Sequence, residues 1–90
     1  MMSSIKLYSL PDSIESDLLL RSHLDTVQLW LCLLEGDSRS QLLWKRLGVS
    51  CVASDFYFQN RMAVLCLTDY SIVLLEFDAG MNVIEDNSLE

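Results

Sequence analysis

The stretch at residues 61–77, RMAVLCLTDYSIVLLEF, decides the fold that this sequence predicts. Two short apolar runs lie on either side of a polar break at Thr68-Asp69-Tyr70. Short apolar runs that are bounded by turn-forming residues are typical of strands, and a break of this length suits a hairpin. We therefore expect antiparallel strands at residues 61–67 and 71–77.

Both of these strands are apolar on their two faces. In the first strand, Ala63 and Leu65 alternate with Val64 and Cys66, and residues 71–77 repeat the pattern. A sheet with one face in water shows a clean alternation of apolar and polar residues instead. The rest of the chain can cover one face of this sheet, so a partner is expected on the other.

Further strands flank this hairpin. Residues 49–58 alternate with a period of two, and the short break at Gln59-Asn60 separates them from the strand at 61–67. Asp78-Ala79-Gly80 forms a turn signal, after which residues 81–85 would add a short fourth strand. The C-terminal half therefore predicts an antiparallel meander of three or four strands.

The N-terminal half predicts helices. Five apolar residues recur at spacings of four and three, which is the stripe of an amphipathic helix: Leu20, Leu24, Val27, Leu31 and Leu34. Gly36 stands where a C-terminal cap would lie, so a helix is expected over residues 13–35. Asp37 or Ser38 can cap a second helix, over residues 37–47, that stops at Gly48.

The expected fold is therefore α+β, with a helical hairpin packed on one face of the meander. Weak alternation at residues 5–10 allows an N-terminal edge strand. A single domain would occupy residues 1–84, and residues 85–90, EDNSLE, would form a solvated acidic tail. The run LWLCLL at residues 29–34 is apolar on every side of the expected helix, which is a second indication of a partner.

Charge and cysteine content narrow the class of protein. The net charge of −7 disfavours direct binding to nucleic acid, which needs a basic face. The longest strictly apolar run has six residues, whereas a membrane-spanning helix needs about 20. The sequence has three cysteines, an odd number, and each lies within an apolar stretch: Cys32, Cys51 and Cys66. Both features are expected of reduced thiols. We expect a soluble intracellular protein, cytoplasmic or nuclear, with no membrane insertion.

The sequence offers no catalytic, cofactor-binding or metal-ligating motif. His23 is the single histidine, and no CxxC or HxxxH spacing accompanies it. A small enzyme would need His23 beside Cys51 or Cys66 in a pocket, because a thiol nucleophile requires a base. The three glycines are isolated and do not form a phosphate-binding loop. We therefore predict a protein that is not an enzyme and holds no cofactor.

The predicted function is protein–protein association, as an obligate subunit or small accessory factor of a homo- or hetero-oligomeric complex. Large aromatic anchors and the apolar residues that the fold cannot cover would form the interface. These residues are Trp30, Leu33, Leu34, Trp44, Phe56, Phe58, Val64, Ile72 and Leu74.

The alternative function is that of a small acidic inhibitor or nucleic-acid mimic that occupies a basic site on another protein. This alternative requires the acidic side chains to gather on one surface, where they would stand in for phosphates. The carboxylates concerned are Asp12, Glu15, Asp17, Asp25, Asp55 and Asp69.

Overall fold

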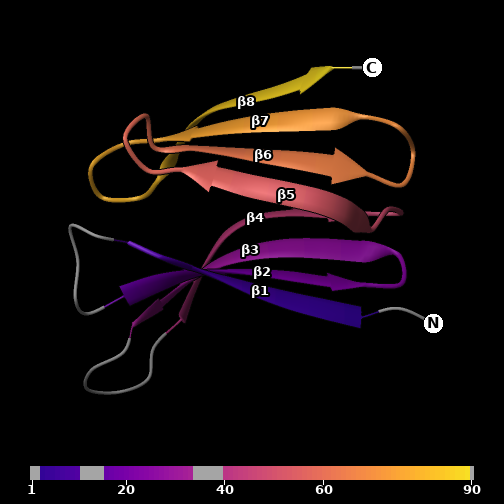
Figure 1. Cartoon of the computed structure of the whole chain (residues 1–90), viewed down its shortest axis with the longest axis horizontal. Helices are drawn as coiled ribbons and strands as arrows, with labels where there is room; N and C mark the ends of the chain where they lie inside the picture. The colour runs from indigo at the N-terminus through magenta and orange to yellow at the C-terminus, as the bar shows by residue number, and fades with distance from the viewer. Residues whose placement is uncertain (1–2, 11–15, 34–39, 90) are drawn as a thin grey trace.

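The computed structural model describes residues 3–10, 16–33 and 40–89, and every regular element within them is a β-strand. Figure 1 shows these strands as two layers, the first indigo to magenta and the second red to yellow. The eight strands are β1 (Ser3–Ser9), β2 (Ser16–His23), β3 (Thr26–Leu33), β4 (Ser40–Leu47), β5 (Cys51–Tyr57), β6 (Met62–Leu67), β7 (Ile72–Phe77) and β8 (Val83–Leu89).

Each layer is an antiparallel meander of four strands. The first sheet has the order β1-β2-β3-β4, and the second has the order β5-β6-β7-β8. The radius of gyration is 12.7 Å, against about 12 Å for a compact domain of this length. Among the described residues no helix is present that is long and apolar enough to cross a membrane.

The helix predicted over residues 13–35 is wrong for the part of that range that the structure describes. Residues 16–23 and 26–33 instead form the hairpin of β2 and β3. Leu24 has a φ of 48° and turns the chain there, so it lies exposed between two strands instead of on a helical stripe. On either side of the turn the buried residues follow a period of two, as Leu18 and Leu20 do in β2.

The second predicted helix, over residues 37–47, is also wrong within the described range. Residues 40–47 form β4, which pairs with β3 across a register shift between Leu29 and Trp30. The fold is therefore all-β and not α+β, because a second sheet stands where the helical hairpin was expected. Gly48, expected to stop a helix, follows β4 with a φ of 84° and donates its N–H to the Asp25 carbonyl at 2.7 Å.

The predicted meander in the C-terminal half is confirmed. Strands β5, β6 and β7 match the expected ranges within three residues at each end, and β8 is the fourth strand. The strand allowed at residues 5–10 is present as β1, at one edge of the first sheet. β8 extends to residue 89, so most of the segment that was expected to be an acidic tail pairs with β7.

The hydrophobic core lies between the two sheets. Leu18, Val27 and Leu29 of the first sheet are almost fully buried, as are Leu65, Val73 and Leu75 of the second. Phe56 stacks edge-on against Phe77, with ring centroids 6.3 Å apart. Because both sheets contribute to one continuous cluster, each sheet has an inner face in the core and an outer face that no other described element covers.

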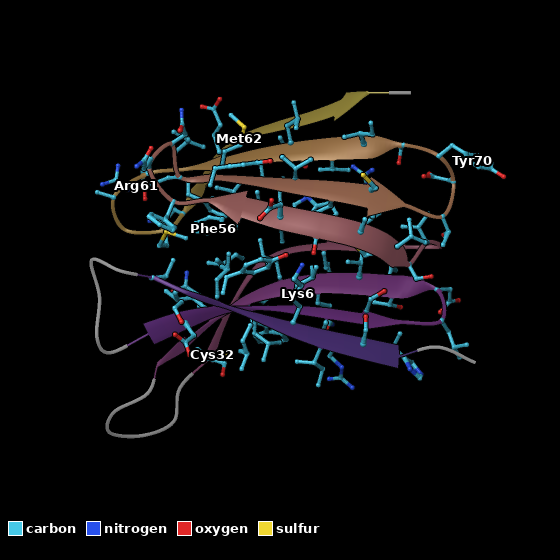
Figure 2. The ribbon with its side chains drawn as sticks, in the orientation of Figure 1. Lys6, Cys32, Phe56, Arg61, Met62 and Tyr70 are labelled. Atoms are coloured by element: carbon cyan, nitrogen blue, oxygen red, sulfur yellow. The ribbon has the colours of Figure 1, made fainter. Side chains whose placement is uncertain are left out.

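Polar contacts show that the sheets stack in the same strand order. At one edge, the Tyr8 hydroxyl of β1 lies 2.6 Å from Ser54 Oγ of β5, and Lys6 Nζ donates to the Ser54 carbonyl at 3.1 Å. At the other edge, Trp44 of β4 bonds to Asp86 of β8. β1 thus lies over β5, and β4 lies over β8. Figure 2 shows Lys6 and Phe56 in the space between the layers.

Candidate functional site

The outer face of the first sheet carries a continuous apolar row. Strand register places Leu7 opposite Leu19, Leu19 opposite Trp30, and Trp30 opposite Leu42, so the row crosses all four strands. Leu7 is 60% exposed, and Ile5, two residues before it on the same face of β1, is 66% exposed. The row is therefore a contiguous apolar patch on a face that no other described element covers.

An open groove of about 500 Å³ lies over the middle of this row, at Leu19 and Trp30. Ile5, Leu19 and Trp30 supply its apolar lining, and Arg21 and His23 lie among its polar residues. The indole Nε1 of Trp30 donates to the Gln28 side chain of the same strand at 3.2 Å, which fixes the ring against the sheet. The groove is therefore a preformed, mainly apolar surface that opens to solvent.

The outer face of the second sheet has a matching apolar centre. Val64 lies opposite Leu74, and Cys66 lies opposite Ile72, in the pairing of β6 with β7. Val64, Cys66 and Leu74 are half-buried by their neighbours within the sheet, and Ile72 is 38% exposed. Both outer faces of the molecule thus present apolar side chains to solvent.

The two outer faces differ in charge. Arg21 and Lys45 lie exposed on the first, in one row with Gln28 between them, and Asp17 is the carboxylate on that face. The second face carries the carboxylates of Asp55, which pairs with Val64, and Glu76, which pairs with Met62. The first face is therefore net positive and the second net negative, counting the described side chains.

The described side chains do not form the cysteine–histidine pair that an enzyme would need. His23 lies on the outer face of β2, whereas the Cys51 N–H bonds to Ser22 Oγ on the inner face. Burial raises the pKa of the Cys51 thiol, which leaves it protonated and a poor nucleophile. Cys66 lies on the outer face of the other sheet.

Cys32 also lies apart from His23, although both line the groove. Cys32 stands opposite Asp17, six residues along β2 from His23, which corresponds to about 20 Å. Within the described residues no group of three or more potential metal ligands is found. The groove therefore brings apolar side chains together and leaves its cysteine and its histidine far apart.

The residues predicted for a partner interface fall into three groups. Trp30, Val64, Ile72 and Leu74 lie on the outer faces, and Phe58 is exposed just after β5. Trp44 and Phe56 are buried between the sheets, where they belong to the core. Leu33 lies at the end of β3, and Leu34 is outside the described residues.

Sequence reasoning missed several members of the first outer face, namely Ile5, Leu7, Leu19 and Leu42. The helical interpretation of residues 13–47 hid Leu19 and Leu42, because a helix does not place them in one row with Leu7 and Trp30 as the strand register does. Alternation at residues 5–10 was the available signal for Ile5 and Leu7, which that pattern places on one face of a strand.

The acidic-inhibitor alternative requires its carboxylates to share one surface. Those that the structure describes lie in separate places. Asp17 and Asp25 stand near opposite ends of the β2–β3 hairpin, and Asp55 is on the outer face of the second sheet. Asp69 lies in the β6–β7 turn, where hydrogen bonds from the Ser71 hydroxyl and N–H lower its pKa. Asp12 and Glu15 lie outside the described residues.

Comparison of the chain with protein-family models, with curated proteins and with solved structures finds no match.

Proposed function

We propose that this chain is a non-enzymatic protein-association module, acting as an obligate subunit or accessory factor of a larger complex. The observation that carries the proposal is the apolar row formed by Leu7, Leu19, Trp30 and Leu42 on a face that no described element covers. The apolar centre on the opposite face supports it. Trp30 is the natural anchor, since large aromatic side chains dominate interface energies.

A modest apolar contact would be enough for stable association. Removal of about 600 Å² of apolar surface from water contributes on the order of 15 kcal/mol before the costs of association are subtracted. Even after those costs, the folded state would be stabilised by partner binding through mass action. The same burial explains why both faces are apolar in a chain of only 90 residues.

An intracellular location belongs to this proposal. All three cysteines lie in described strands and are unpaired, which suits a reducing compartment.

A protein that displays two apolar faces also gains from being made alongside its partner, because the free faces would promote aggregation.

The proposal is tested by affinity purification of the tagged chain from its native cells, followed by reconstitution with each purified binder. Leu7→Glu places a charge in the apolar row and should abolish a direct interaction. Tyr70→Glu is the matched control, because Tyr70 is 92% exposed in the β6–β7 turn, away from both outer faces. Binders that are indifferent to Leu7→Glu and to an equivalent change on the second face, Ile72→Glu, would contradict the proposal.

Salt dependence separates this function from the acidic-inhibitor alternative. An apolar interface should keep most of its affinity between 50 and 500 mM salt, a range over which the Debye length falls roughly threefold. Affinity that falls steeply over that range would instead indicate carboxylates bound to a basic site. The Leu7→Glu variant would then bind nearly as well as the wild type.

A further inference from the structure

We propose that the occupant of each outer face is a second copy of this chain, joined head to tail. The outer face of the second sheet in one copy packs on the outer face of the first sheet in the next. This inference rests on the proposed association function and names its partner. Four observations carry it: repetition of the sheet unit, the chain path between the units, matched apolar centres and opposite charge.

The two sheets are repeats of one structural unit. Each is a four-stranded antiparallel meander, and buried residues occupy equivalent positions about 45 residues apart. Leu20 and Leu65 match in the second strands of the units, and Val27 and Val73 match in the third strands. Units of four strands and about 40–45 residues, stacked face to face, are the blades of β-propellers.

The path of the chain between the units is also that of successive blades. β4 lies at one edge of the first sheet, and after only Gly48, Val49 and Ser50 the chain enters β5, which lies over β1 at the other edge. The second unit therefore begins on the same edge as the first. A third unit placed by the same step would cover the outer face of the second sheet.

The apolar centres of the two outer faces suit such a contact. Leu19 and Trp30 lie in the two middle strands of the first sheet, and Val64 and Leu74 lie in the two middle strands of the second. The inner faces already pack through the same two pairs of middle strands. The contact between copies would thus repeat the type of packing that exists within one copy.

Charge favours the head-to-tail arrangement over a symmetric one. Arg21 and Lys45 on the first outer face would meet the face that carries Asp55 and Glu76. Two copies joined through the same acidic face would bring like charges together, which disfavours that pairing. A head-to-tail contact leaves one free face of each kind, so copies continue to add, and the rotation between successive blades of a propeller is one that closes a ring. Because propellers have roughly four to eight blades, a closed ring would hold roughly two to four copies.

The test uses two variants of the full chain that each block one face. The first-face variant is Ile5→Glu/Leu7→Glu, and the second-face variant is Ile72→Glu/Leu74→Glu. Ile5, Leu7 and Ile72 are exposed, and circular dichroism of each variant checks that the strands still form. Tyr70→Glu is again the control. Mass is measured by light scattering for each protein alone and for an equimolar mixture of the two blocked variants.

The expected result is a discrete oligomer for the wild type and for Tyr70→Glu, at two or more times the chain mass of 10.3 kDa. Each blocked variant alone should be a monomer. Their mixture should form a 1:1 dimer, because one intact face of each kind remains and the two blocked faces repel each other. That combination is the signature of a head-to-tail contact.

Two outcomes would overturn the inference. A blocked variant that still dimerises alone shows a symmetric contact through its remaining face. A wild type that stays monomeric at high micromolar concentration shows that a second copy is not the occupant. The association function itself fails separately, when purified binders from native cells are indifferent to changes on both faces.

Discussion

The indole Nε1 of Trp44 in β4 donates a hydrogen bond of 2.9 Å to Oδ2 of Asp86 in β8. The two residues lie 42 positions apart and join the last strands of the two sheets across the edge of the core. The Trp44 ring is 9% exposed, and the guanidinium of Arg46 lies 5.3 Å from the ring centroid. Trp44 thus fills the core with its ring and binds the second sheet through its nitrogen.

Trp44→Phe should lower the free energy of unfolding by about 1 kcal/mol beyond the effect of the smaller ring, because the bond to a carboxylate is lost. The value is below the roughly 1.5–3 kcal/mol that is typical of a charged acceptor, since Asp86 is exposed and water can replace the indole. Urea unfolding of Trp44→Phe, Asp86→Ala and the double variant measures the coupling. A coupling energy near zero would show that the bond does not stabilise the stacked sheets.

Leu75→Ala and Leu74→Ala should have opposite effects on folding and association, although the residues are neighbours in β7. Leu75 is fully buried between the sheets, so its truncation should cost about 2–5 kcal/mol of stability. Leu74 is on the outer face, and its truncation should leave a larger part of the stability intact while weakening association. Urea unfolding and light scattering of both variants check this. Equal destabilisation by the two would contradict the assignment of inner and outer faces.

The strand pattern of the C-terminal half was predictable, and that of the N-terminal half was not, for a specific reason. In β2 and β3 the side chains at Leu20, Val27 and Leu31 satisfy a helical spacing and a strand alternation at the same time, because a two-residue turn shifts the phase between the strands. Leucine is also a strong helix former. The pairing of β3 with β4 and β2 overrides that local preference, and pairing is a property of distant residues.

The prediction of the interface residues was limited because the local sequence does not determine the register of the strands. Whether a large apolar residue lies inward or outward depends on its register, and one position separates the two faces of a strand. Trp30 is on an outer face, whereas Trp44 and Phe56 are in the core. All three nevertheless lie in apolar or aromatic stretches of the sequence. The excess of apolar residues could be recognised from sequence, but its division between a core and two outer faces required the register.

Gly48→Ala should destabilise the fold by about 1–2 kcal/mol, because Gly48 has a φ of 84° in the short connection between the sheets. An added Cβ would meet no atom within 4 Å, so the cost comes from the backbone conformation alone. Gly48→Asn should recover part of the loss, since asparagine tolerates positive φ better than alanine. Urea unfolding of the three proteins gives the comparison. An alanine variant as stable as the wild type would show that the connection adopts another conformation.

The stability gained from Asp78 should depend on pH. The Oδ1 atom of Asp78 accepts hydrogen bonds of 2.9 Å from the N–H groups of Asn82 and Gly80 in the turn before β8. The bond from the Asn82 backbone is the main cause that lowers the pKa of Asp78 below its ordinary value of 3.8. Because the folded state has the lower pKa, the carboxylate stabilises the fold above pH 3.8, and this contribution is lost as the pH falls through the folded pKa.

Asp78→Asn keeps an acceptor oxygen without the charge, so it should unfold at a lower urea concentration than the wild type at pH 6. The difference should shrink as the pH approaches 3, and urea titrations at both pH values measure it. A difference that stays constant or grows toward low pH would exclude the Asp78 carboxylate as its source.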